Sequence, residues 1–177
     1  MPIISQMPRL VVFSGVPGTG KSQLAEHAAR RLAASLLSKD IIEAALWRAG
    51  IGTEQNSGWA AYEVMTAQAE QELGSGRTVV LDSVAKTESI RNTWRELALR
   101  VQAKLVIVEC VLTDEATHRA RIEGRQRGIP GWPELTWDAV EGVRAGFAPW
   151  PDERLILDAV RPLAENLRAL DDYLART

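Results

Sequence analysis

The stretch GVPGTGKS at residues 15–22 constrains the fold more than any other feature of this chain. It matches the pattern G-x-x-x-x-G-K-[S/T] in full and comes directly after the apolar run RLVVFS at residues 9–14. The pattern has structural meaning only between a strand and a helix. Both are expected here, since the preceding run is unbroken in hydrophobicity and Leu24, Ala28 and Leu32 follow at helical i, i+4 spacing.

A loop of this kind is suited to holding the phosphates of a nucleotide. Glycines let successive backbone N–H groups curl around phosphate oxygens, and the N-terminus of the next helix adds a partial positive charge. Lys21 is expected to bridge the β- and γ-phosphates, and the Ser22 hydroxyl to ligate Mg²⁺. An ordinary Gly-Pro turn is the alternative. The predicted nucleotide-binding residues of the loop are Gly15, Val16, Pro17, Gly18, Thr19, Gly20, Lys21 and Ser22.

The rest of the chain alternates apolar runs with segments of helical period. Such alternation indicates an α/β protein in which helices cover both faces of a parallel sheet. We therefore expect a three-layer α/β/α domain over residues 1–177, with residues 1–8 as a candidate disordered end. The predicted strands are residues 10–14, 36–38, 78–81, 105–112 and 155–157. The predicted helices include residues 41–48 and 59–73, one after a Thr113 cap, and one with Pro162 in its first turn.

Composition narrows the function classes. The net charge of −2 implies no general affinity for polyanions. A single cysteine, Cys110, excludes an intramolecular disulfide and a cysteine-based metal site. No apolar run approaches membrane-spanning length, and the first residues lack the pattern of a signal peptide. The expected location is the cytoplasm.

Two carboxylates follow predicted strands and should face the glycine-rich loop. Ligands of open parallel sheets bind at the carboxyl ends of the strands, where Asp40 and Asp82 are expected. Asp40 could accept the proton of an attacking hydroxyl, or it could be the N-cap of a helix that begins at Ile41. Asp82 could support Mg²⁺, or it could cap a turn. No Asn-Lys-x-Asp pattern for guanine occurs in the chain, which favours adenine.

A basic segment near residue 120 carries four arginines: Arg119, Arg121, Arg125 and Arg127. Such a run is often a solvated helix face. In a chain that holds a triphosphate, a mobile basic lid over about residues 114–133 is the better explanation, because guanidinium groups pair with phosphate oxygens. Arg121 and Arg125 are one helical turn apart and could reach the same ligand. The glycines at 128 and 131 would let the lid close.

Taken together, four segments resemble the small P-loop kinases of the group that includes the polynucleotide kinase domain, chloramphenicol phosphotransferase and zeta-toxin-like enzymes, often labelled AAA-family ATPases. They are GVPGTGKS, SKDIIEAAL, GRTVVLDSVAKTESIRNTW and HRARIEGR. The resemblance implies a P-loop NTPase fold with strand order 2-3-1-4-5. It also implies that Asp40 orients or deprotonates the acceptor hydroxyl, that Arg121 and Arg125 clamp phosphates, and that Arg161 lies at the adenine edge.

Other residues have two interpretations each. Trp47, Trp59 and Tyr62 flank a loop at residues 50–58 and could wall an acceptor site or pack in the core. His118 could contact the nucleotide or be an ordinary packed histidine. Arg91 and Arg95 could form a solvated helix face. Residues 132–150 match no recognisable acceptor pocket.

The sequence therefore predicts a phosphotransferase that uses ATP and Mg²⁺ to phosphorylate a hydroxyl of a small molecule. Lys21, Asp40, Arg121 and Arg125 are the predicted catalytic residues, and Ser22 and Asp82 the predicted metal ligands. One alternative is a kinase of nucleic-acid 5′-hydroxyls, which the chain's acidic pI of about 5.8 disfavours. Another is a nucleotide-binding regulator with little transfer activity.

Overall fold

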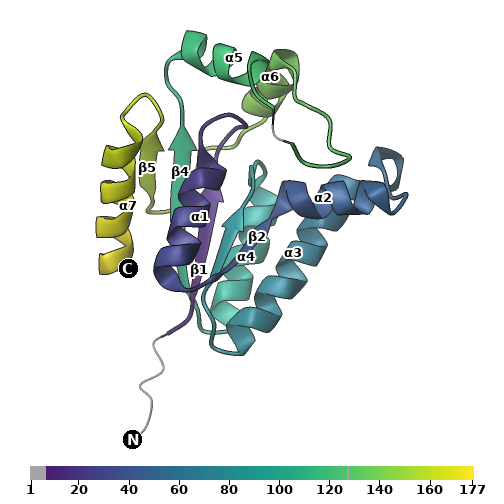
Figure 1. Cartoon of the computed structure of the whole chain (residues 1–177). Coiled ribbons are helices and arrows are strands. Elements are labelled where there is room, and N and C mark those ends of the chain that lie inside the picture. The colour runs from purple at the N-terminus through teal and green to yellow at the C-terminus, as the bar shows by residue number, and fades with distance from the viewer. Residues whose placement is uncertain (1–6, 127) are drawn as a thin grey trace, which may run out of the picture.

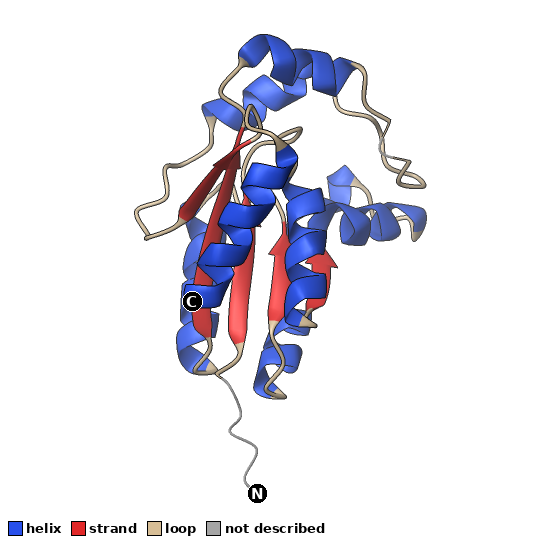
Figure 2. Cartoon of the chain, turned by 60° about the vertical axis from the view of Figure 1, so that its left-hand side comes forward, coloured by secondary structure: helices blue, strands red, loops and turns tan. Residues whose placement is uncertain are grey.

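The structure, a computed structural model, describes residues 7–126 and 128–177. Most of the candidate disordered end and Arg127, one of the four arginines of the basic segment, lie outside the described residues. Figure 1 shows the elements in order along the chain, and Figure 2 shows the helices on both sides of the strands.

Five parallel strands form one sheet in the order β2-β3-β1-β4-β5, which confirms the expected order. The glycine-rich loop leaves the central strand, as the pattern requires. The strands are β1 (Arg9–Ser14), β2 (Ser35–Ser38), β3 (Val79–Asp82), β4 (Lys104–Val111) and β5 (Leu155–Asp158).

Helices cover both faces of the sheet and its carboxyl end. The helices are α1 (Lys21–Leu32), α2 (Lys39–Arg48), the short 3-10 turn η1 (Thr53–Gln55), α3 (Ser57–Gly74), α4 (Glu88–Arg100), α5 (Glu115–Glu123), α6 (Trp137–Ala145) and α7 (Leu163–Arg176). Helices α1 and α7 pack on one face, and α3 and α4 on the other. Helices α5 and α6 lie above the carboxyl ends of the strands (Figure 1) and are called the α5–α6 cap below.

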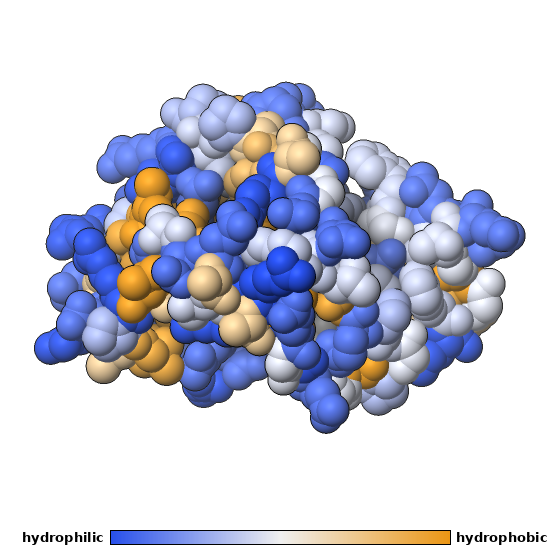
Figure 3. Space-filling model, turned by 90° about the horizontal axis from the view of Figure 1, so that it is seen from above, coloured by the Kyte–Doolittle hydropathy of each residue, from blue (hydrophilic) through white to orange (hydrophobic). Residues whose placement is uncertain are grey.

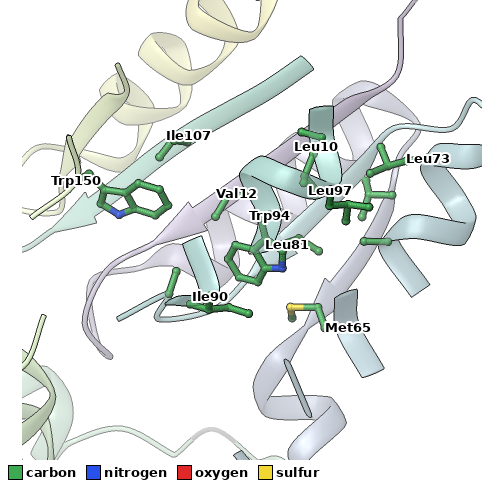
Figure 4. Close-up of a cluster of buried hydrophobic side chains, with 14 residues drawn as sticks. Leu10, Val12, Met65, Leu73, Leu81, Ile90, Trp94, Leu97, Ile107 and Trp150 are labelled. Atoms are coloured by element: carbon green, nitrogen blue, oxygen red, sulfur yellow. The ribbon is translucent and has the colours of Figure 1, made fainter. Parts of the chain in front are cut away.

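The central strand β1 divides the core into two halves. Successive side chains of a strand point to opposite faces, so Leu10 and Val12 enter the cluster under α3 and α4, shown in Figure 4. Val11 and Phe13 enter the cluster under α1 and α7. All four side chains are fully buried. This two-sided burial confirms the three-layer architecture and explains why the run at residues 9–14 is apolar at successive positions.

Strand register brings the predicted site residues to one edge of the sheet. Asp82 at the end of β3 pairs with Phe13 of β1 on one side and with Ser38 of β2 on the other. Because α2 begins immediately after β2, Asp40 is the second residue of that helix. The segments that carry Asp40, Asp82 and the glycine-rich loop therefore meet at the carboxyl edge.

Several helix boundaries differ from the sequence-based expectations. Helix α2 begins at Lys39, so Asp40 lies in its first turn and is not the N-cap. Asp114, not Thr113, caps α5, since its carboxylate accepts a hydrogen bond from the Thr117 amide at 2.6 Å. Helix α5 ends at Glu123, so Arg125 lies beyond the helix that was expected to carry it. Helix α6 had no sequence-based prediction.

The small α5–α6 cap has its own apolar contacts, made by Ile122, Trp137 and Val140. The boundaries of a lid at residues 114–133 and of one domain over the whole chain stay predictions. In the described part of the chain, no helix combines the length and apolar character that crossing a membrane requires.

Candidate active site

A cavity of about 550 Å³ opens at the carboxyl edge of the sheet, below the α5–α6 cap. It has two ends. The phosphate-loop end is lined by Gly18, Gly20, Lys21 and Ser22. The α2 end is lined by Lys39, Asp40, Ser83, Trp132 and Leu135, and Asp82 lies between the two ends, within hydrogen-bond reach of Ser22. Arg121 and Arg125 also line the cavity, so both predicted clamp residues lie within reach of its contents.

The glycines of the loop have specific steric reasons to be glycine. Gly15 has φ +143°, and a Cβ there would lie 2.1 Å from the backbone oxygen of Cys110 on β4. Gly18 has φ +88°, and a Cβ there would lie 2.7 Å from Cδ1 of Ile122 in α5. Both backbone conformations are ones that residues with a side chain rarely adopt. The loop is thus pressed between the central sheet and the cap.

Hydrogen bonds inside the loop hold its ends together. The ammonium of Lys21 donates to the Val16 carbonyl at 3.0 Å, and the Thr19 hydroxyl donates to the same oxygen at 2.9 Å. Lys21 is buried, and this burial lowers the pKa of its ammonium, while the carboxylates of Asp82 and Asp40 act in the opposite direction. The lysine therefore supplies positive charge in a largely water-free position.

Asp82 and Ser22 form a pair of oxygen ligands beside the lysine. Burial raises the pKa of the Asp82 carboxyl, and the charge of Lys21 and a hydrogen bond from the Ser22 hydroxyl counteract that shift. A buried carboxylate needs positive partners to stay ionised. Hard oxygen ligands in small number suit Mg²⁺, which keeps several waters and binds phosphate oxygens as well. The two residues thus fit the predicted metal site, although no cluster of three or more His, Cys, Asp or Glu residues occurs in the described ranges.

Asp40 lines the same cavity as the phosphate loop. Its charge acts on both Lys21 and Asp82, which shows that the three groups share one electrostatic environment. Helix α2 presents Asp40 from its first turn, where a carboxylate also interacts favourably with the helix dipole. Asp40 therefore lies in the same cavity as the phosphate loop, and its role in orienting an acceptor stays a prediction.

A polar network behind Asp40 was missed by sequence reasoning. Glu43, which is 5% exposed, forms an ion pair with Lys39 and accepts a hydrogen bond from Ser57 Oγ at 2.9 Å. The Trp47 indole N–H donates to that same Ser57 oxygen at 2.8 Å. The network fixes α2 against the start of α3. The i, i+4 spacing of Lys39 and Glu43 was the one sequence signal that could have indicated it.

The segment between α5 and α6 lies across α2, as Figure 1 shows, and residues 128–132 of it are called the strap below. The Arg48 guanidinium donates to the Pro130 carbonyl at 2.6 Å. The Trp132 ring meets the Trp47 ring edge to face at 5.1 Å between centroids, and the Lys39 ammonium lies 5.7 Å from its centroid. The strap is held against α2 in this way and borders the cavity through Trp132.

Arg121 and Arg119 differ although both belong to α5. Arg121 lines the cavity and donates to the Ala159 carbonyl at 3.2 Å. Arg119 forms an ion pair with Glu123 and is 60% exposed. The basic run is therefore part cavity wall and part solvated surface: the solvated-face interpretation holds for Arg119, and a lid that contains Arg121 stays a prediction.

A smaller cavity of about 170 Å³ adjoins the phosphate loop on the side of β5. It is lined by Gly20, Gln23, Arg121, Arg161 and Asn166, among others. Figure 3 looks down on this end of the molecule: hydrophilic side chains cover most of it, and apolar ones gather on the side where β5 and α7 lie. Arg161 thus lies beside the loop, and its contact with an adenine stays a prediction.

Some candidate residues are structural. Arg91 is completely buried and is not part of a solvated face: it donates to the Ala85 and Pro149 carbonyls at 2.8 and 3.0 Å, and its guanidinium carbon lies 4.1 Å from the Trp150 ring centroid. Arg95 forms ion pairs with Glu88 and Asp152. These contacts tie α4 to the segment after α6. The sequence-based interpretation failed because Trp150 and Pro149 are distant in the chain.

The aromatic residues around loop 50–58 also have different surroundings. Trp59 is 44% exposed and does not line the cavity. The Tyr62 hydroxyl accepts a hydrogen bond from the Ala85 amide at 3.2 Å, and the Lys39 ammonium lies 5.7 Å from its ring centroid. Trp47 supports Trp132, which does line the cavity and which no sequence pattern had indicated.

The strand order, the glycine-rich loop between β1 and α1, and the cap above that loop define the fold of small P-loop kinases. The chain belongs to the AAA domain family, whose sequence profile matches residues 10–149. Among curated proteins, the chain is similar to the uncharacterized protein Rv2004c of Mycobacterium tuberculosis, with 32% identity over 116 residues that cover 59% of this chain and 23% of the relative. It therefore spans less than a quarter of the length of that relative.

Solved structures agree on the fold. A candidate kinase of Chloroflexus aurantiacus matches with a TM-score of 0.78 and 22% identity over 97% of this chain and 98% of that one. A gluconokinase of Sinorhizobium meliloti matches with a TM-score of 0.70 and 22% identity over 97% of this chain and 94% of that one. The APS kinase of Mycobacterium tuberculosis, solved with AMPPNP and APS, matches with a TM-score of 0.70 and 19% identity over 96% of this chain and 98% of that one. The expected resemblance to small P-loop kinases is thus confirmed for the fold.

Proposed function

We propose that this protein transfers the γ-phosphate of ATP to a hydroxyl group of a small molecule, with Mg²⁺ as the metal. The observation that carries this proposal is that Asp40 and the phosphate loop line one cavity. A carboxylate in this place can orient an attacking oxygen toward the γ-phosphorus. The cytoplasm, where ATP is supplied, remains the proposed location.

The donor binds at the phosphate-loop end. The loop N–H groups and the N-terminus of α1 receive the phosphate oxygens, and the ammonium of Lys21 turns from the Val16 carbonyl to the β- and γ-phosphates. Ser22 and Asp82 would hold the metal, which neutralises charge on the phosphate oxygens when it is bound. The smaller cavity beside Arg161 receives the base.

The acceptor binds at the α2 end. Its hydroxyl donates a hydrogen bond to Asp40, which aims the oxygen at the γ-phosphorus. A new O–P bond forms as the bond from the γ-phosphorus to the bridging oxygen of ADP breaks, and the hydroxyl proton passes to Asp40 and then to solvent. The transition state is loose, so aiming matters more than basicity. Arg121 and Arg125 stabilise the charge of the transferring group.

The cap and the strap keep water away from the transferring group. Hydrolysis of ATP is the competing reaction, so closure of the cavity favours transfer. The strap also supplies the Trp132 ring as a wall for the acceptor. The named activities of the gluconokinase and the APS kinase, which share the fold, support a small-molecule acceptor.

Label transfer from γ-labelled ATP tests the proposal. Pools of nucleosides, sugars, aminoglycosides, amphenicols and 5′-hydroxyl oligonucleotides are offered as acceptors. The wild type should label at least one small-molecule pool. Asp40→Asn should reduce that transfer by about 100-fold or more while nucleotide affinity changes less than about threefold, as expected for the loss of a catalytic carboxylate.

The matched control is Asp172→Asn, an exposed carboxylate of α7 that is remote from the cavity lining. It should transfer label like the wild type. Equal transfer by the Asp40→Asn variant would contradict the proposed role of Asp40. Label in the oligonucleotide pool alone would favour the nucleic-acid kinase, and label in no pool the nucleotide-binding regulator.

A further inference from the structure

His118 of α5 reaches the phosphate loop from the cap. The side chain is completely buried, and both of its ring nitrogens have partners. Nε2 lies 2.7 Å from the Pro17 carbonyl oxygen in the loop. Nδ1 lies 2.9 Å from the Arg144 guanidinium of α6. One imidazole therefore connects the loop to both helices of the cap.

The partners of His118 determine where its proton lies. A guanidinium has only hydrogen-bond donors, so Arg144 must donate to Nδ1, which acts as an acceptor. The remaining nitrogen, Nε2, then carries the proton and donates it to the Pro17 carbonyl. The Trp137 ring packs edge to face on the imidazole at 5.2 Å, and the Arg144 guanidinium lies 5.1 Å from the Trp137 centroid. The ring is thus neutral and cannot rotate without losing these contacts.

The bond to Pro17 controls the direction of the next amide. In a trans peptide the C=O and N–H groups point to opposite sides, so a carbonyl held toward α5 turns the Gly18 N–H away from α5. Pro17 itself has no N–H, which makes the Gly18 amide the first donor after Val16. A Cβ on Gly18 would lie 3.0 Å from His118 Nε2, so the imidazole touches the loop backbone at this residue.

We propose that His118 is a positioning residue that holds the Pro17–Gly18 peptide in its phosphate-binding orientation and thereby couples nucleotide binding to the packing of the α5–α6 cap. The proposal rests on the nucleotide-binding part of the proposed function and is independent of the identity of the acceptor. It assigns to α6 a part in the donor site although Arg144 does not line the cavity.

Charged groups around His118 make this device sensitive to pH. Burial lowers the pKa of the imidazole, the bond to Pro17 opposes that shift, and the charges of Arg144 on α6, Lys21 on α1 and Arg121 on α5 add to it. Glu115, on the same helix as His118, lies 3.4 Å from Arg144. Protonation of Nδ1 would place a donor against the Arg144 donor. We therefore expect the loop contact to hold at neutral pH and to fail once the pH falls well below the usual histidine range.

Two substitutions separate hydrogen bonding from packing. In His118→Gln, the amide oxygen can accept from Arg144 and the amide nitrogen can donate to Pro17, but the group does not titrate. His118→Phe keeps a flat ring and removes both hydrogen bonds. The matched controls are His27→Gln and His27→Phe, because His27 lies on α1 and is hydrogen-bonded to Asp171 at 2.9 Å, away from the loop.

ATP affinity is measured by calorimetry at pH 7.5 and pH 4.5, with thermal unfolding of each nucleotide-free variant beside it. At pH 7.5, His118→Phe should weaken binding about tenfold, as expected for one lost buried hydrogen bond, and His118→Gln less than about threefold. Between the two pH values, wild-type affinity should fall more than that of His118→Gln. This comparison cancels the titration of the phosphate itself, which occurs near pH 6.

Wild-type affinity in both the Phe and the Gln variants, or the same pH dependence in the wild type and His118→Gln, would overturn the proposal. If His118→Phe does not fold, the pH comparison with His118→Gln still decides. Failure of the wild type to bind ATP at all would overturn the proposed function together with this inference. Binding without label transfer would affect the proposed function alone.

Discussion

The phosphate-loop end of the cavity comes from the consecutive residues 15–22, whereas the α2 end comes from segments far apart in the chain. At the first end, backbone conformation is the critical feature, with Gly15 and Gly18 at positive φ. At the second end, side chains are critical: Asp40 follows β2, Ser83 follows β3, and Trp132 belongs to the strap.

This difference has a physical consequence for variation. A loop that binds phosphate through its backbone depends on a few glycines and one lysine, so the same loop can serve reactions with different acceptors. A wall made of side chains from separate elements can change one residue at a time and so change the acceptor. The comparison predicts that substitutions at the two ends will affect different kinetic constants.

The largest effect should come from Arg121→Ala, because Arg121 lines the cavity that holds both Asp40 and the phosphate loop and can stabilise charge on the transferring group. We expect kcat for label transfer to fall by about 100-fold or more, the usual loss for one electrostatic contact to a transition state. The control is Arg119→Ala, which removes only an exposed ion pair with Glu123 and should change kcat less than about twofold. Equal losses in both variants would mean that the whole run acts as a general basic surface.

The next largest effect concerns stability. Arg91→Met removes the guanidinium from the Trp150 ring and leaves the Ala85 and Pro149 carbonyls without their donors. We expect the free energy of unfolding to fall by roughly 2–4 kcal/mol, measured by urea denaturation. Since Ala85 follows the end of β3, the acceptor KM should rise more than the nucleotide Kd.

Arg100→Met is the control for that experiment, because Arg100 also belongs to α4 but forms only an exposed ion pair with Glu70 of α3. This substitution should lower the free energy of unfolding by less than about 1 kcal/mol. A change of the same size for both arginines would show that the buried contacts of Arg91 contribute no more than a surface pair.

The smallest effect should come from Trp132→Ala, which removes the aromatic wall at the α2 end and its contacts with Trp47 and Lys39. The acceptor KM should rise about tenfold while the nucleotide Kd stays within about threefold, since loss of one stacked ring costs on the order of 1 kcal/mol. Trp59→Ala, which removes an exposed ring outside the cavity, is the control. A rise in nucleotide Kd with unchanged KM would assign Trp132 to the phosphate-loop end.

Sequence reasoning succeeded where a requirement is local. The pattern at residues 15–22 needs a strand before it and a helix after it, and β1 and α1 provide both. The apolar runs located all five strands within a few residues. Burial on both faces explains the continuous apolar signal of the inner strands β1 and β3, whereas the edge strands β2 and β5 are apolar but partly exposed. The strand order came from the resemblance to P-loop kinases and is confirmed.

Sequence reasoning failed where partners are distant. Arg91 and Arg95 resemble a solvated helix face until Trp150 and Asp152 are brought against them. Arg125 was placed on a helix that ends two residues earlier, at Glu123. Helix α6 and the strap gave no pattern that distinguishes them from a loop, so neither Trp132 nor Arg144 was a candidate.

The sequence by itself determined that this chain has a phosphate-binding loop at the end of a buried strand, because consecutive residues set the backbone angles that such a loop requires. Sequence reasoning had already placed Asp40 and Arg121 near that loop, but only the tertiary structure decided that His118 packs against it. These side chains meet because parallel strands end at one edge and the cap folds over that edge, and contacts between distant segments depend on packing that no single stretch of sequence encodes.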